Sequence, residues 1–232
     1  MMTTFSRIQA VLFDVDGTLL DTTAFIYGGF DHALAAHGHA PAGRAAYARV
    51  MGKPLEVCYV ELAPGGDSAL LCETHRTWQA DNLHLSVAFP EAEHVLRALR
   101  DAGLRLAAIT SRSARTSVRT LEQAGLASYL DLVLSAEDVT AIKPDPAPLR
   151  LALERLGVEP AAAVMVGDTD ADILAGKAAG VRTVGVSYGF HGADVAAAGP
   201  DATIDRLGTL LPLLRIETQR RRGGQRPQRK DL

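Results

Sequence analysis

The feature that most constrains the fold is an alternation between short apolar runs and segments with helical periodicity. The strand candidates are the runs at residues 10–13, 104–109, 132–134, 163–166 and 181–186. The segments with helical spacing end in glycines, which commonly stop helices, at Gly103, Gly125, Gly157 and Gly180. Because parallel strands can be joined only through crossovers of this kind, we expect an α/β fold built on a doubly wound parallel sheet.

Residues 22–87 break this alternation. They contain two long segments with helical spacing and no strand-like run between them. We expect them to form a helical insertion at the carboxyl edge of the sheet. The predicted organisation is a core domain at 1–21 and 88–214, an α-helical cap domain at 22–87, and a disordered basic tail at 215–232, where seven Lys or Arg accompany two acids.

Composition places the chain among soluble globular proteins. Hydrophobic residues make up 47% and charged residues 22%, and no apolar run approaches the roughly 20 residues of a membrane span. The N-terminus lacks an export-signal pattern, so we expect a cytoplasmic protein that binds no membrane. The net charge of −3 combines a basic tail with an acidic body, which disfavours nucleic acid as a partner. Cys58 and Cys72 lack a metal-ligand spacing and are predicted to be reduced packing residues.

Carboxylates, hydroxyls and one lysine follow the strand candidates. They are Asp14, Asp16, Thr110, Ser111, Lys143 and Asp168. In a doubly wound sheet such residues meet at one edge, where ligands bind. A divalent cation is the common way to offset repulsion between carboxylates gathered in a partly desolvated site, and all-oxygen ligation suits Mg²⁺. The sequence therefore predicts a magnesium site.

Such a site would also receive an anion with several oxygens, and phosphate fits. Lys143, Thr110 and backbone amides around Gly17 and Thr18 would bind it together with the cation. One aspartate could attack phosphorus while Asp16 protonates the leaving oxygen and later deprotonates water. Gly17 would allow the chain to turn sharply away from the strand.

Four segments together resemble the signature motifs of the haloacid dehalogenase superfamily of phosphatases. They are "DVDGT" at 14–18, the strand ending in Thr110, "KPDP" at 143–146 and "GDTDAD" at 167–172, in the family's order and spacing. The resemblance covers residues 10 to about 214 and is greatest to phosphoglycolate phosphatases and the related pyrophosphatases. It implies a Rossmann-like core and a helical cap that closes over the substrate.

The resemblance also implies roles for individual residues. Asp14 would be the nucleophile that forms an aspartyl-phosphate, and Asp16 the general acid and base. Thr110, with Ser111 beside it, would bind the phosphoryl group, and Lys143 would steady both nucleophile and phosphate.

By the same likeness, Asp168 would ligate Mg²⁺ together with the Asp14 carboxylate and the Asp16 carbonyl. Asp172 would support this site, although its place one helical turn beyond Asp168 also suits helix capping. Asp170 is expected at the surface.

Within the predicted cap, "RVMGKPLEVC" at 49–58 resembles the stretch that contacts substrate in relatives. Arg49 and Lys53 are thus candidates for binding a second anionic group, or they are ordinary exposed charges. His191 follows the fifth strand candidate and is expected in a surface loop.

The function predicted from these observations is Mg²⁺-dependent hydrolysis of small phosphomonoesters, with phosphoglycolate or pyrophosphate as the first candidates. The partner would be a small phosphorylated metabolite, acted on by a monomer or homodimer. A sugar-phosphate mutase similar to β-phosphoglucomutase is the closest alternative, and a non-catalytic phosphate-binding regulator is an alternative of another class. Asp16 argues against a dehalogenase, since dehalogenases of the superfamily lack the second aspartate.

Overall fold

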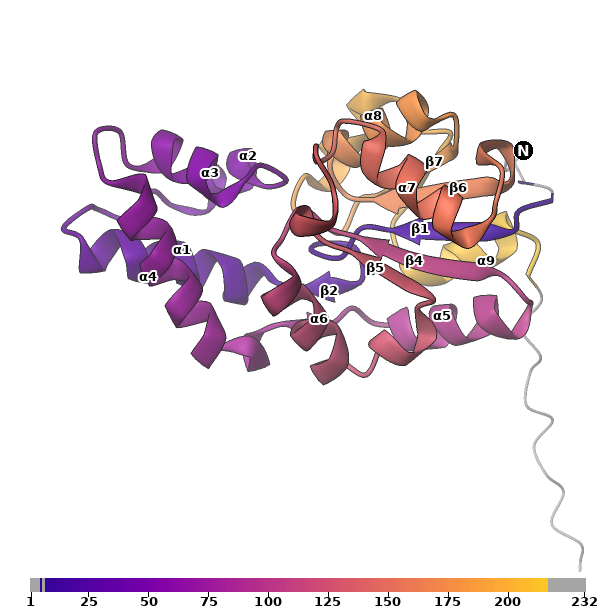
Figure 1. The fold of residues 1–232 in the computed structure, drawn as a ribbon, viewed down its shortest axis with the longest axis horizontal. Coiled ribbons are helices and arrows are strands. Elements are labelled where there is room, and N and C mark those ends of the chain that lie inside the picture. Colours follow the sequence, from indigo (N-terminus) through magenta and orange to yellow (C-terminus); the bar gives the residue numbers. More distant parts are fainter. Residues whose placement is uncertain (1–4, 6, 217–232) are drawn as a thin grey trace, which may run out of the picture.

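In the described part of the chain, the main sheet has six parallel strands in the order β5-β4-β1-β6-β7-β8. A computed structural model describes Phe5 and residues 7–216 (Figure 1). The strands are β1 (Ala10–Phe13), β4 (Arg105–Ile109), β5 (Leu132–Leu134), β6 (Ala163–Gly167), β7 (Arg182–Val186) and β8 (Ala202–Ile204). The predicted doubly wound parallel sheet is confirmed. The strand candidates correspond to β1 and β4–β7, whereas β8 was not predicted because its three residues lack an apolar run.

Helices cover both faces of this sheet because alternate strand residues point to opposite sides. Val11 and Phe13 pack in one apolar core with α5 (Ala92–Asp101), α6 (Ala114–Gln123) and α9 (Leu210–Leu213). Ala10 and Leu12 pack in a second core, with α7 (Ala147–Leu156) and α8 (Asp170–Ala179). The segments of the chain that connect these strands and helices include the 3₁₀ helices η2 (Ala127–Tyr129), η3 (Ala136–Asp138), η4 (Pro160–Ala162), η5 (Gly192–Ala198) and η6 (Leu207–Thr209).

A separate group of helices lies beside the sheet edge at the left of Figure 1. It comprises α1 (Thr23–Ala36), α2 (Arg44–Val50), α3 (Leu55–Leu62), α4 (Ser68–Asp81) and the 3₁₀ helix η1 (Leu83–Leu85). We call these elements the helical insertion. They share an apolar core of their own, in which Phe30 stacks on Tyr47 and the free thiols of Cys58 and Cys72 are buried. The division into core and cap domains stays a prediction.

The two ends of the helical insertion are joined by a short antiparallel ribbon. Strand β2 (Leu20–Asp21) precedes α1, and β3 (Val87–Ala88) follows η1. Leu20 pairs with Ala88 and Asp21 with Val87. The chain therefore enters and leaves the insertion at one place, directly after the turn that follows β1.

The helices of the described part of the chain include none with the length and apolarity that a membrane crossing demands. Most of the predicted basic tail, residues 217–232, lies outside the described residues.

Candidate active site

The candidate site lies where the strand order reverses. From β1 the chain goes to β4 and β5 on one side, and it then crosses to β6 on the other side of β1. Ligands of doubly wound folds bind at such a switch point, beyond the carboxyl ends of the strands. Asp14 directly follows β1, Thr110 follows β4 and Asp168 follows β6. The sheet thus brings the predicted residues of three separate motifs to one edge.

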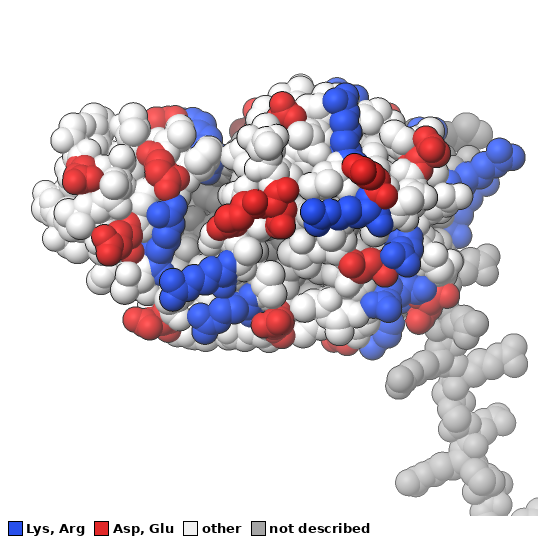
Figure 2. Space-filling model, in the orientation of Figure 1, with Lys and Arg blue, Asp and Glu red and all other residues white. Residues whose placement is uncertain are grey.

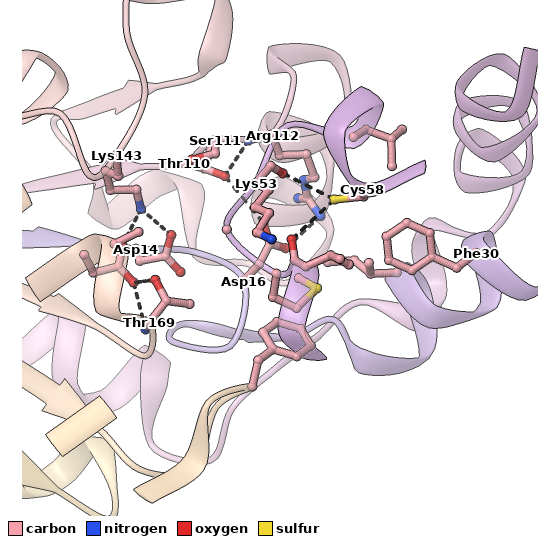
Figure 3. A pocket seen from close by; sticks show the side chains of 18 of the residues that line it. Asp14, Asp16, Phe30, Lys53, Cys58, Thr110, Ser111, Arg112, Lys143 and Thr169 are labelled. Atoms are coloured by element: carbon pink, nitrogen blue, oxygen red, sulfur yellow. Dashed lines mark hydrogen bonds and ion pairs between the residues drawn. The ribbon is translucent and has the colours of Figure 1, made fainter. Parts of the chain in front are cut away.

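Lys143 lies at this edge with its amine between two carboxylates. Its Nζ lies 2.6 Å from Oδ1 of Asp14 and 2.7 Å from Oδ1 of Asp172, and it donates a 2.8 Å hydrogen bond to the carbonyl of Ile109. The residue is only 4% exposed. Burial alone would lower the pKa of this amine, but the carboxylates of Asp14 and Asp172 raise it above its ordinary value. This direction favours the charged ammonium form of Lys143, whose contacts are drawn in Figure 3.

Asp14 and Asp172 form a cluster of three buried carboxylates with Asp168, in which each residue offers an oxygen within 4.8 Å of the others. Burial raises the pKa of Asp14 to about 7 against the opposing effect of Lys143, and burial also raises the pKa of Asp168. Oδ2 of Asp14 is buried and has no hydrogen-bond partner among the described residues. Crowded carboxylates with an unpartnered oxygen fit a divalent cation, which would supply the missing positive charge.

Asp168 and Asp172 are held by their surroundings. Oδ2 of Asp168 accepts a 2.6 Å hydrogen bond from the backbone N–H of Phe190, and its Oδ1 lies 3.5 Å from the hydroxyl of Thr18. Oδ2 of Asp172 accepts from the backbone N–H and hydroxyl of Thr169, so that these residues form a capping box at the start of α8. Asp172 therefore caps the helix with one oxygen and faces Lys143 with the other.

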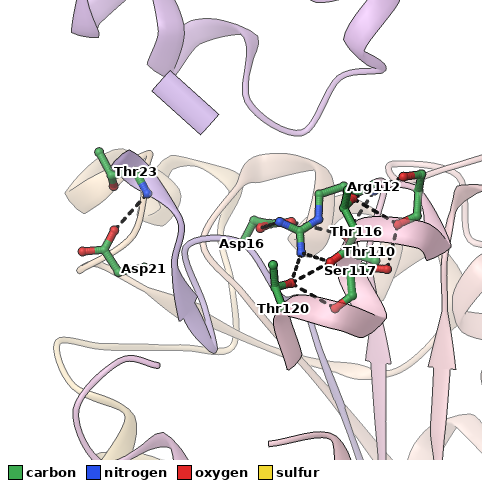
Figure 4. A network of polar contacts seen from close by, with 9 residues as sticks. Asp16, Asp21, Thr23, Thr110, Arg112, Thr116, Ser117 and Thr120 are labelled. Carbon is green, nitrogen blue, oxygen red and sulfur yellow. Dashed lines mark hydrogen bonds and ion pairs between the residues drawn. The ribbon is translucent and has the colours of Figure 1, made fainter. Parts of the chain in front are cut away.

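Asp16 also lines the cavity and is held by a residue that the motifs did not indicate. Arg112 donates a 2.9 Å hydrogen bond from NH1 to Oδ1 of Asp16, and the Thr110 hydroxyl lies 3.4 Å from Oδ2 (Figure 4). The side chains of Arg112 and Asp16 are 11% and 12% exposed. The motifs indicated Thr110 and Ser111 but not Arg112, which follows them in the same loop at the end of β4.

The guanidinium of Arg112 has further contacts with α6 and with the helical insertion. Its NH2 group donates to the carbonyl of Thr116 and the hydroxyl of Thr120 on α6. The ring of Phe25, on α1 of the helical insertion, lies 5.2 Å from its Cζ in a cation–π contact. Arg112 thus connects Asp16 with both the sheet-centred part and the helical insertion.

Gly17 forms the turn that directly follows Asp14 and Asp16. Its φ is +91°, a conformation that side chains disfavour, and its N–H donates to the carbonyl of Leu20 at 2.8 Å. A Cβ on this residue would lie 2.2 Å from Oδ2 of Asp168. Tyr188 donates from its hydroxyl to the carbonyl of Thr18 at 2.8 Å, which fixes the same turn.

We expect Gly17→Ala to lower activity about 100-fold, because the new methyl group must displace the Asp168 carboxylate. The left-handed backbone adds a cost of about 1–2 kcal/mol in stability. Phosphate release and thermal unfolding measure the two effects. Gly103→Ala is the matched control, since Gly103 has φ +84° with no atom within 4 Å of a Cβ. Equal activity losses in the two variants would contradict the role given to the contact between Gly17 and Asp168.

A cavity of about 120 Å³ opens between these residues and the helical insertion, and a second hollow of about 450 Å³ adjoins it. Figure 2 shows the surface hollowed between the two parts, with acidic and basic side chains on either side. Leu55, Gln79, Ser111 and Arg112 line both spaces. The insertion therefore forms the wall that faces the predicted nucleophile.

The predicted substrate residues of the insertion have different positions. Lys53 lines the cavity and forms a 2.6 Å ion pair with Glu61. Arg49 is exposed on α2 and is not among the lining residues, so the structure does not bring it to the site. His191 is also outside the lining; its Nδ1 lies 3.8 Å from Oδ1 of Asp170, whose side chain is 64% exposed.

A family model and individual relatives agree with this architecture. Residues 11–186 match the family of haloacid dehalogenase-like hydrolases. The chain is 37% identical over 222 residues to a plasmid phosphoglycolate phosphatase of Cupriavidus necator, covering 92% of this chain and 96% of that protein. It is 33% identical over 220 residues to pyrophosphatase PpaX of Bacillus velezensis, covering 92% and 100%.

A solved structure, that of a haloacid dehalogenase-like hydrolase from Bacteroides fragilis, superposes with a TM-score of 0.79 at 30% identity. It covers 88% of this chain and 99% of its own. The class of protein is thus an α/β protein with a doubly wound core and an acidic cluster at its switch point. The chain belongs to the haloacid dehalogenase-like hydrolase family, as its four motifs indicated.

Proposed function

We propose that the protein is a Mg²⁺-dependent phosphatase that hydrolyses small phosphomonoesters through a phosphoryl group carried on Asp14. The observation that carries the proposal is the position of Lys143, whose amine lies between the carboxylates of Asp14 and Asp172. A buried nucleophile beside a fixed ammonium suits attack on a dianionic phosphoryl group. Two relatives named for phosphoglycolate and pyrophosphate hydrolysis support the same reaction class.

The first half of the reaction transfers the phosphoryl group to the enzyme. Lys143 and Thr110 bind phosphoryl oxygens, and a carboxylate oxygen of Asp14 attacks phosphorus. The bond between phosphorus and the leaving oxygen breaks, and Asp16 donates its proton to that oxygen. The products are a free alcohol and an aspartyl-phosphate.

The second half returns the enzyme to its starting state. Asp16, now ionised, takes a proton from water as the water oxygen attacks the phosphorus of the aspartyl-phosphate. The acyl–phosphate bond breaks, Asp14 recovers its carboxylate and inorganic phosphate leaves. The helical insertion would keep other water away from the reacting atoms.

The acidic cluster is the proposed magnesium site. The carboxylates of Asp14 and Asp168 and the carbonyl of Asp16 would hold the ion, with Asp172 in support. When bound, Mg²⁺ would neutralise negative charge on the phosphoryl oxygens.

We expect removal of divalent metal to lower phosphate release about 100-fold or more, and we expect Mg²⁺ to restore it. The measurement is phosphate release from a panel of phosphomonoesters after dialysis against a chelator. Mg²⁺ should also raise the unfolding temperature of the native protein, because it binds the folded state. Asp168→Asn should remove that rise, and an equal rise in this variant, or full activity in chelator, would refute the metal site.

The same assay separates the alternative functions. A mutase would protect the aspartyl-phosphate from water and release little phosphate. A non-catalytic regulator would release none, although each proposed catalytic position is filled in this chain.

A further inference from the structure

We propose that this site selects phosphomonoesters with an uncharged, largely apolar leaving group, and that it disfavours esters carrying a second anionic group. The inference rests on the proposed phosphatase function and concerns the wall that the leaving group would meet. It differs from the preferences that the names of the relatives indicate, since glycolate and phosphate are both anionic leaving groups.

The helical insertion presents a hydrocarbon surface to the cavity. Its lining side chains there include Ile26, Phe30, Val50, Met51, Leu55 and Cys58, contributed by α1, α2, α3 and the loop after α2. Phe30, Val50 and Cys58 are each at most 3% exposed and belong to the apolar core of the insertion. This wall therefore favours contact with carbon atoms over contact with charged or strongly hydrated groups.

The polar groups that α4 adds to this wall are neutral. His75 is buried, and its Nδ1 shares a 2.8 Å hydrogen bond with the hydroxyl of Tyr59. Burial lowers the pKa of His75 to about 3, so the imidazole carries no charge at neutral pH. Gln79, which is 5% exposed, adds an amide. These groups can bind a hydroxyl or carbonyl oxygen of a leaving group but supply no counter-charge.

Each Lys or Arg that lines the cavity within the described residues already has a carboxylate partner. Lys143 lies between two aspartates, and Arg112 binds Asp16. Lys53 pairs with Glu61 at 2.6 Å, and their side chains are 40% and 45% exposed, which leaves this pair in water. The Nε of Arg112 has no hydrogen-bond partner, but the charge of the guanidinium is matched by Asp16.

A second anion on the substrate would have to break one of these pairs or lose its hydration against the hydrocarbon wall. Asp14, Asp16 and Asp172 also line the cavity and would repel a further negative charge that lies close to them. The transferring phosphoryl group itself is bound by Lys143, Thr110 and the proposed metal ion. Among the described residues that line the cavity, the leaving group would meet no cation without a carboxylate partner.

Two esters that differ by one carboxylate test this inference on the native, full-length protein with Mg²⁺. Phenyl phosphate and 4-carboxyphenyl phosphate have the same ring and the same scissile bond. We expect kcat/KM to be about tenfold or more higher for phenyl phosphate, mainly through KM. We expect kcat/KM for 2-phosphoglycolate and for pyrophosphate to be low, as for the carboxylated ester. Equal or higher kcat/KM for the carboxylated ester would overturn the inference.

Variants in the wall give an independent readout. Met51→Lys places a cation beside the leaving group and should reduce the ratio of the two kcat/KM values about fivefold or more by pairing with the carboxylate. The matched control Met51→Leu keeps the wall apolar and should preserve the ratio. An unchanged ratio in a folded Met51→Lys protein would overturn the inference. A Lys53→Met variant that lost activity toward 4-carboxyphenyl phosphate but kept it toward phenyl phosphate would also overturn the inference, because Lys53 would then bind the second anionic group.

Failure of the proposed function has a different result. If neither aryl ester, nor 2-phosphoglycolate, nor pyrophosphate releases phosphate, the phosphatase assignment itself is refuted. If phosphate is released without preference, the phosphatase assignment stands and only the inference about the leaving group is lost.

Discussion

Asp14→Asn is expected to reduce phosphate release about 10³-fold or more, because an amide cannot attack phosphorus as a carboxylate does. The substitution preserves the size of the side chain and keeps an oxygen near Lys143. Steady-state phosphate release and the absence of an acid-stable phosphoprotein burst would both report the loss. Turnover within a few-fold of the native rate would remove Asp14 from the role of nucleophile.

A measurement of stability shows whether Asp14→Asn loses activity through the missing carboxylate or through misfolding. Burial raises the pKa of Asp14 to about 7, so this carboxyl lowers the stability of the folded protein progressively as the pH rises from its ordinary pKa of 3.8 through about 7. At pH 8 without metal, the Asn variant should therefore be at least as stable as the native protein. Asp170→Asn, at an exposed carboxylate, is the matched control and should keep native activity.

Lys143→Met is expected to lower both activity and stability. The variant leaves the carboxylates of Asp14 and Asp172 without the ammonium between them, and loss of one partner from a buried pair costs about 3–5 kcal/mol. Activity should fall about 10²-fold or more, since the positive charge that Lys143 would offer to the phosphoryl group is lost. Chemical denaturation and phosphate release measure the two quantities.

The control for Lys143→Met is the same substitution at Lys53, a partly exposed lysine of the same cavity. Its ion pair with Glu61 is exposed to water, so Lys53→Met should change stability by less than about 1 kcal/mol. Comparable destabilisation by the two variants would show that Lys143 does not stabilise the acidic cluster.

Much of the site could be predicted because the sheet imposes it. Short apolar runs that alternate with helical segments indicate parallel strands, and parallel strands that share one sheet bring their carboxyl ends to one edge. The proximity of Asp14, Thr110 and Asp168 follows from this rule alone. Lys143 follows its strand by a loop of several residues, so its position depended on the family resemblance as well.

The remaining features depend on contacts between distant segments. The role of Arg112 is fixed by Asp16 and by Phe25 of the helical insertion, and neither neighbour is visible in the local sequence. Whether Arg49 or Lys53 faces the cavity depends on how α2 and the following loop pack, which periodicity does not determine. The β2–β3 ribbon has two residues in each strand, too few for an apolar pattern.

That ribbon separates two tasks within one polypeptide. The side chains proposed for the chemistry lie at the ends of the sheet strands. Most of the apolar lining belongs to the helical insertion, which the β2–β3 ribbon joins to the rest of the chain. Substitutions beyond this ribbon can therefore reshape the apolar lining without altering the residues at the strand ends. The contacts of Phe25 with Arg112 and of Tyr27 with Phe190 constrain such changes, because each ties the helical insertion to the part of the chain around the sheet.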